Sequence, residues 1–242
     1  MEFISFEKMA AAINADLKSR YLEKFPKACS AALSRTAVRC KLAMQDHMRA
    51  NFDRPTKWAI DAVRAVPATV ETMSSAVLLR EFSSKGTPAE KYLGPQIMGG
   101  GRSLKRSEKA LASAQYLKPG GFMMPGDAAK MDQFGNQSRG EIVKILSVLR
   151  AFGEQGYRAN RKKGWSKKTR VGQIFAVRQG NTHAGLKPGV YRRTDTGVVC
   201  LMRFVSKAPN YRVRLPFDEL VMADAARIFP EELERAVVEI GK

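Results

Sequence analysis

The residues best suited to chemistry lie in one segment, AEKYLGPQIMGGGRSLKRSEKAL, residues 89–111. Three glycines, Gly99, Gly100 and Gly101, run directly into a basic stretch, and glycines followed by cations are typical of phosphate cradles. A Walker loop requires G-x-x-x-x-G-K-[ST], and a dinucleotide loop requires G-x-G-x-x-G between a strand and a helix. The segment satisfies neither pattern. We therefore predict that the glycines form a tight backbone turn, in which positive φ costs little.

The basic stretch that follows is predicted to be a helix from about Ser103 to Gln115. At about 100° per residue, four cations fall on one side and Leu104 and Leu111 fall on the other. The cations are Arg102, Lys105, Arg106 and Lys109. Each cation at a helix start interacts unfavourably with the helix dipole, at a cost of a few tenths to about 1 kcal/mol. An acidic partner or phosphates bound there would offset this cost. The alternative is a solvated basic face whose repulsion is screened by salt.

A second basic segment, residues 157–170, contains seven bases and no acid. Its bases are Arg158, Arg161, Lys162, Lys163, Lys167, Lys168 and Arg170. Tyr157 and Trp165 lie among them, a mixture that suits nucleic acid because phosphates attract the cations and bases stack on the rings. A flexible surface loop explains the same composition. Both basic segments are candidates for contact with a DNA channel or an acidic partner.

Catalytic patterns are absent from the sequence. The chain has two histidines, His47 and His183, and contains no G-x-S-x-G or H-E-x-x-H motif. Three cysteines, Cys29, Cys40 and Cys200, are far apart and form no C-x-x-C pair, which favours reduced structural thiols over a zinc site. We predict that the protein is not an enzyme and uses no cofactor or metal. An enzyme reading depends only on His183 and on two loop acids, Asp127 and Asp132.

The elements that must position these residues predict an α+β fold, with an antiparallel or mixed sheet backed by helices. Residues 1–50 are expected to be an N-terminal helical arm, with an apolar stripe from Phe6 to Tyr21 and a second from Cys29 to Met48. Residues 51–242 are expected to be the core domain. Strands are predicted near 58–82 and 171–206, with a hairpin turn at Asp195-Thr196-Gly197.

Two further helical regions complete the prediction. Ser138 and Glu141 form the S-x-x-E pattern of a capping box ahead of an apolar stripe that ends at Phe152. Between the basic helix and this one, LKPGGFMMPGD is predicted to be a turn-rich connection. At the C-terminus, one short helix begins at Phe217, and Pro230 is expected to start a second.

Charge is the strongest compositional feature. The net charge is +19, and by our count residues 216–242 carry about −4 while residues 1–215 carry about +23. This asymmetry indicates contact with a polyanion or an acidic protein surface, or pairing of a basic body with the acidic tail of another copy. The chain contains no apolar run of about 18 residues, so no membrane partner is expected. From the residues at its N-terminus we expect no secretory signal.

Several segments together resemble minor tail protein Z, a tail-completion family of tailed bacteriophages. The resemblance is carried by residues 89–111, by GGFMMPGDAAKMDQFGN and by SRGEIVKILSVLRAF. NFDRPTKWAIDAVRAVPAT and NYRVRLPFDELVMADAARIFPEEL extend it over most of the chain from Asn51 onward. The resemblance implies a virion protein of the tail or neck, assembled in the host cytoplasm, with no catalytic residues to carry over.

The expected partners follow from this resemblance. They are other copies of the chain in a homo-oligomeric ring, the neck, adaptor, portal or tail proteins of the phage, and double-stranded DNA bound without sequence specificity. Repeated weak phosphate contacts around a ring would add up to substantial binding. The alternative is a sequence-independent nucleic-acid-binding protein that acts outside a virion.

Overall fold

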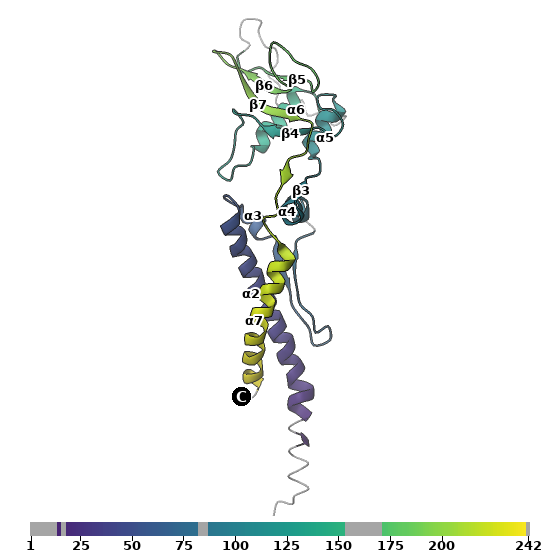
Figure 1. The fold of residues 1–242 in the computed structure, drawn as a ribbon, viewed down its shortest axis with the longest axis vertical. Coiled ribbons are helices and arrows are strands. Elements are labelled where there is room, and N and C mark those ends of the chain that lie inside the picture. The colour runs from purple at the N-terminus through teal and green to yellow at the C-terminus, as the bar shows by residue number, and fades with distance from the viewer. Residues whose placement is uncertain (1–13, 16–17, 82–86, 153–170, 241–242) are drawn as a thin grey trace, which may run out of the picture. The chain divides into compact units, whose positions relative to one another are not determined.

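The structure is a computed structural model that describes residues 14–15, 18–81, 87–152 and 171–240 (Figure 1). The fold is α+β, as predicted. The chain divides into two compact units. Unit 1 comprises residues 1–99 and 212–242, and unit 2 comprises residues 100–211. The boundaries between the units, after residues 99 and 211, therefore differ from the expected boundary at residue 50. The reason is that the first long helix packs within unit 1 and does not form a separate arm.

Unit 1 is built on two long helices, α2 (Phe25–Asn51) and α7 (Phe217–Ile240), which lie side by side (Figure 1). They run antiparallel, since Arg35 on α2 bonds to Glu239 while Cys40 lies against the carbonyl of Val221. Small buried side chains, Ala28 and Ala32 on α2 and Ala236 on α7, share one cluster between the helices. The predicted helix over 29–48 is confirmed, and most of the predicted stripe 6–21 lies outside the described residues.

Helix α7 differs from the prediction of two C-terminal helices. It continues through Pro230 without a break from Phe217 to Ile240. Proline lacks the N–H that would bond to the carbonyl four residues earlier, so it normally ends or kinks a helix. Here the flanking residues Ile228 and Glu232 are both buried, and packing against α2 holds the backbone helical on both sides. Pro26, by contrast, lies in the first turn of α2, where its missing N–H costs little, and α2 follows directly after a short π-helix, η1 (Ser19–Lys24).

A small hairpin and two helices complete unit 1. Strands β1 (Val63–Val66) and β2 (Ala76–Leu79) pair antiparallel, which confirms two strands in the region 58–82. The region begins instead with a helical turn, α3 (Lys57–Ile60), because the Thr56 hydroxyl accepts the N–H of Ala59 at 3.2 Å. Helix α4 (Ala89–Met98) follows. The buried core of this region joins Met44, Met48, Ile60, Val63, Leu93, Leu215 and Phe217.

Unit 2 contains a four-stranded antiparallel sheet in the order β4-β7-β6-β5. Its strands are β4 (Phe122–Pro125), β5 (Ile174–Val177), β6 (Gly189–Arg193) and β7 (Val198–Val205). The three strands predicted over 171–206 are confirmed, and the Thr194 N–H donates to the Gly197 carbonyl at 2.8 Å in the predicted hairpin turn. The prediction of a connection at 117–127 is wrong, because residues 122–125 pair with β7 as an edge strand that ends at Pro125.

Two helices contribute to the core of this sheet, α5 (Arg106–Ser113) and α6 (Arg139–Val148). Leu111 from α5 and Ile145 from α6 are fully buried. The predicted capping box at the start of α6 is wrong: Ser138 precedes the helix, but its side chain makes no cap hydrogen bond. Glu141 instead accepts the Lys130 N–H at 2.8 Å and the Gln137 amide at 3.3 Å, so it fastens the preceding loop to the helix.

The glycine triplet ends α4 and begins unit 2. Gly99 and Gly100 have φ of 74° and 82°, which confirms the predicted positive φ. Gly100 and Gly101 also form a short strand, β3, paired antiparallel with β8 (Asn210–Tyr211). The basic helix begins at Arg106 rather than near Ser103, so residues 102–105 form an extended link between β3 and α5.

Candidate polyanion-binding surface

The excess of positive charge is concentrated in unit 2. By sequence, residues 100–211 carry 22 Lys and Arg against six Asp and Glu, a net charge of +16. The remainder of the chain carries 20 bases and 17 acids, a net charge of +3. The acidic tail seen in the sequence therefore offsets the bases of unit 1 in the fold, because α7 belongs to that nearly neutral unit.

Glu108 neutralises one of the cations that the sequence assigned to an exposed face. Its side chain is fully buried, and its carboxylate accepts two bonds from the Arg102 guanidinium, at 2.5 and 2.8 Å. Arg102 is only 10% exposed and also lies 5.1 Å from the Phe122 ring centroid. The prediction that Arg102 points outward with its neighbours is therefore wrong, since an internal acid already occupies it.

The same carboxylate caps α5. Glu108 accepts the Lys105 N–H at 2.6 Å and the Met123 N–H at 2.9 Å. It therefore supplies a hydrogen-bond acceptor to the backbone just before α5 and to the backbone of the neighbouring strand β4. Burial raises the pKa of Glu108, but the Arg102 guanidinium and the two backbone N–H groups outweigh burial and hold that pKa below its usual range. The sequence signal for this arrangement was a Glu at the third position of the helix, and it was overlooked in favour of the surrounding cations.

Three other acids of unit 2 also have internal partners. Asp127 pairs with Arg203. Asp132 accepts the N–H groups of Phe134 and Asn136, and Glu141 accepts that of Lys130. Among the described cations of this unit, only Arg102 and Arg203 form an ion pair. Most of the positive charge is thus left unneutralised.

The remaining cations of the predicted basic helix are exposed. Lys105, Arg106 and Lys109 all lie at the surface of unit 2. Sequence reasoning missed other exposed cations because they are scattered along the chain: Lys118, Lys130, Lys144, Arg178, Lys187 and Lys207. The second predicted segment, Arg158 to Arg170, lies outside the described residues. A diffuse surface of this kind attracts a polyanion through its field without reading a sequence.

Aromatic rings accompany the cations on the sheet. Phe175 and Tyr191 stack with ring centroids 5.8 Å apart, and the Arg193 guanidinium lies 5.0 Å from the Phe175 centroid. Tyr191 is buried and its hydroxyl donates to the Lys187 carbonyl at 2.6 Å, whereas Phe175 is half-buried. This group joins a cation to a partly accessible ring, the combination used to bind single-stranded nucleic acid.

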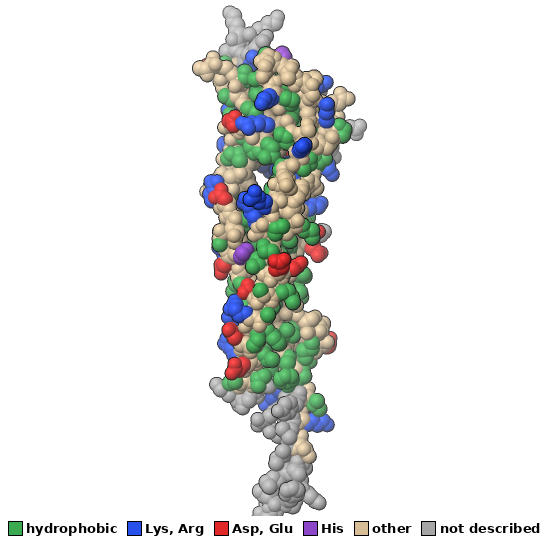
Figure 2. Space-filling model, in the orientation of Figure 1, with side chains coloured by type: hydrophobic (Ala, Val, Ile, Leu, Met, Phe, Trp, Pro, Cys, Tyr) green, Lys and Arg blue, Asp and Glu red, His purple; other side chains and the backbone are tan. Residues whose placement is uncertain are grey.

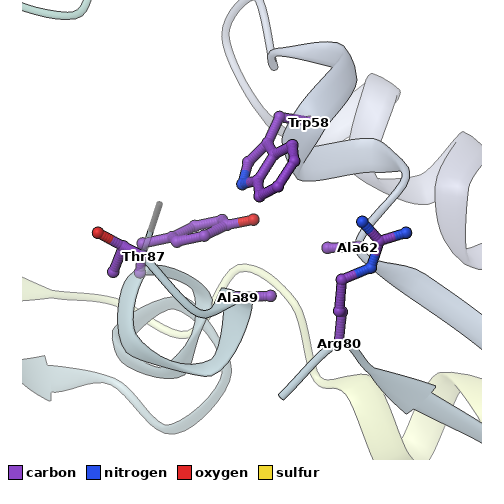
Figure 3. Close-up of a pocket in the computed structure, with 6 residues that line it drawn as sticks. Trp58, Ala62, Arg80, Thr87 and Ala89 are labelled. Carbon is purple, nitrogen blue, oxygen red and sulfur yellow. The ribbon is translucent and has the colours of Figure 1, made fainter. Parts of the chain in front are cut away.

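Unit 1 contains a small pocket lined by Trp58, Ala62, Arg80, Thr87, Ala89 and Tyr92 (Figure 3). The empty space at the pocket amounts to about 180 Å³, a volume that includes open solvent. Figure 3 shows Trp58 on one wall and Ala89, at the start of α4, on the opposite wall. The Arg80 guanidinium lies 5.8 Å from the Trp58 ring centroid. The residues that line the pocket include no carboxylate, histidine or thiol, the usual side chains of a general base.

The described residues contain no cluster of three or more His, Cys, Asp or Glu side chains suited to a metal ion. None of the helices in the described ranges is both long and apolar enough to cross a bilayer. Comparison with protein-family models, curated proteins and solved structures finds no match to this chain.

Proposed function

We propose that this protein is a structural component of a tailed-bacteriophage particle that acts at the head–tail junction during tail completion. In this proposal it forms a homo-oligomeric ring around the DNA channel, with neck, adaptor, portal or tail proteins as its neighbours. The observation that carries the proposal is the separation of charge between the two units, +16 in unit 2 against +3 elsewhere. The segments that resemble minor tail protein Z give the proposal its biological setting.

Two physical features support a role in conducting DNA. The acids of unit 2 are largely occupied by internal partners, so its exposed cations remain available to phosphates. A diffuse set of lysines and arginines also binds DNA weakly enough to allow it to move, because each phosphate contact is exchanged with counterions. Repetition of the same cations around a ring would make the summed attraction large.

The test uses paired charge variants in the phage and in purified protein. Arg106→Gln with Lys109→Gln removes two exposed cations from unit 2, and Arg64→Gln with Lys91→Gln removes two exposed cations from unit 1 as a control. We expect the unit 2 variant to assemble normally but to lose infectivity and bind DNA more weakly, while the control retains both. Equal infectivity of the two variants would contradict the proposed DNA-facing role. A companion variant that neutralises the seven bases of 158–170 extends the test to that segment.

A second candidate function is sequence-independent nucleic-acid binding outside a virion. The group formed by Phe175, Tyr191 and Arg193 favours it, because a cation beside a partly exposed ring suits single strands. Mass measurement and negative-stain imaging separate the two functions. A ring of several copies supports the virion protein, whereas a monomer that prefers single-stranded over double-stranded DNA supports the second function.

A further inference from the structure

Helix α7 leaves an apolar seam uncovered in unit 1. Met222, Ala226, Phe229, Leu233 and Val237 recur at steps of four, three, four and four, which places them on one face of the helix. Phe229 and Leu233 are partly covered by the alanines of α2, but Met222 is 69% exposed and Val237 is 39% exposed. Figure 2 shows hydrophobic side chains gathered over the region where α7 runs in Figure 1.

Acidic residues border this α7 seam. By helical position, the charged residues nearest to it are Asp218, Glu219, Glu232 and Glu234. Glu232 is buried and paired with Arg39, and the other three are exposed. None of these three forms an ion pair within the described part of the chain, in contrast to Glu231 and Glu239, which Arg39 and Arg35 occupy. The α7 seam is therefore an apolar face with uncompensated negative charge at its edges.

Helix α2 also exposes an apolar surface, but this one is bordered by basic residues. Val38 and Leu42, at 49% and 51% exposure, share a helix face with Ala31 and Lys27. Lys24 and Lys27 are exposed at the N-terminal end of this α2 strip, and neither forms an ion pair among the described residues. The α2 strip and the α7 seam each span 15 residue steps, about 22 Å of helix. They match in length and in apolar character, and the charges that border them are opposite in sign.

We propose that the α7 seam of one copy packs against the α2 strip of a second copy of this chain. This inference rests on the proposed ring and specifies the contact that would build it. Two different surfaces meet in this contact, so the contact is heterologous and can repeat from copy to copy until a ring closes. Helix ridges and grooves at steps of three and four supply the packing, and the acids at one end of the α7 seam face the lysines of the neighbour.

The test begins with one substitution in each surface and a matched control. Met222→Glu places a charge in the α7 seam and Leu42→Glu places one in the α2 strip. Met98→Glu adds the same charge at a residue that is 87% exposed and outside both surfaces. By sedimentation and native mass spectrometry we expect the wild type and Met98→Glu to form the same oligomer. Each of the other two variants should be a monomer of about 26.8 kDa, folded as judged by circular dichroism, with subunit affinity at least about tenfold weaker.

Mixing the two disrupted variants tests the heterologous geometry. The intact α7 seam of Leu42→Glu can still bind the intact α2 strip of Met222→Glu, so an equal mixture should form dimers and stop there. An oligomer of unchanged affinity in Met222→Glu or in Leu42→Glu would overturn this inference and leave the proposed ring standing. A wild type that stays monomeric up to high concentration would instead overturn the ring itself, so the two failures are distinguishable.

Discussion

Glu108 binds three parts of unit 2 with one carboxylate. It pairs with the side chain of Arg102, accepts the N–H that precedes α5, and accepts an N–H from β4. From the cations around Glu108, the sequence predicted that an external acid or phosphate would offset the charge at the start of this helix. The structure shows that Glu108, within the same segment, offsets part of that charge. Any outside partner of this segment therefore meets Lys105, Arg106 and Lys109 rather than Arg102.

Glu108→Ala should destabilise unit 2 strongly. The change would leave the buried guanidinium of Arg102 without its counter-charge and two backbone N–H groups without acceptors, and breaking a buried pair in this way costs about 3–5 kcal/mol. Urea unfolding followed by circular dichroism measures the loss. Asp127→Asn is the matched control, since its ion pair with Arg203 is exposed and its removal should change stability little. Equal losses in the two variants would show that burial of the pair is unimportant.

The same residue predicts a dependence on acid pH. Because the folded protein holds the pKa of Glu108 below its unfolded value of about 4.3, its contribution is complete above that value and disappears as the pH falls through the lower folded pKa. The difference in free energy of unfolding between wild type and Glu108→Gln should therefore shrink from pH 6 towards pH 3. A difference that stays constant over this range would mean that the charge of Glu108 does not contribute.

At the scale of elements, hydrophobic periodicity predicted those helices and strands that depend mainly on residues close together in the chain. The stripe from Cys29 to Met48 and the strands β5, β6 and β7 form where periodicity indicated them. Strand β4 escaped detection because its residues, FMMP, resemble a turn and become a strand only by pairing with β7, some 80 residues away in the chain. The continuous helix α7 was not predicted, because packing against α2 overrides the local preference of Pro230 to end a helix.

Pro230 should be a site of easy stabilisation. It is exposed within α7, and replacing it by alanine restores an N–H that can bond to the carbonyl of Ala226. Since proline in a helix interior is about 3 kcal/mol less favourable than alanine, we expect Pro230→Ala to raise the free energy of unfolding by 1 to about 3 kcal/mol. Pro216→Ala is the control, because that proline immediately precedes α7, where its missing N–H costs little. Thermal unfolding compares them, and no gain at Pro230 would indicate that the helix needs a bend there.

Two glycines of unit 2 predict opposite effects on stability. Gly100 has positive φ with free space around it, so Gly100→Ala should cost about 1–2 kcal/mol from backbone strain alone. Gly140 lies in the first turn of α6, where an added Cβ would meet nothing nearer than the Ser138 hydroxyl at 3.8 Å, so Gly140→Ala should stabilise by about 0.5–1 kcal/mol. Chemical denaturation of the two variants tests this. Effects of the same sign would show that conformational preference does not govern these positions.

At the scale of the whole molecule, the sequence could predict the type of partner of the candidate site but not where in the fold its charge lies. Composition alone indicated a polyanion or an acidic partner, and three of the named cations lie exposed as expected. The sequence could not show that Arg102 is internally paired, because that depends on burial of Glu108. It also placed the charge boundary at residue 216, whereas the fold joins the acidic tail to the N-terminal helix and leaves residues 100–211 as the basic unit.

Salt should separate the two activities assigned to the two units. Binding of DNA by the cations of unit 2 releases counterions, so its affinity should fall steeply between 50 and 200 mM salt, by about 10³ or more if six or more phosphates are contacted. Association through the apolar α7 seam depends mainly on burial of hydrophobic surface, which salt does not screen, and its exposed charged border contributes little. Titrating salt while measuring DNA affinity by fluorescence anisotropy and oligomer mass by sedimentation should therefore abolish DNA binding first and leave the oligomer intact. Loss of both at the same salt concentration would mean that charge, rather than the apolar α7 seam, holds the copies together.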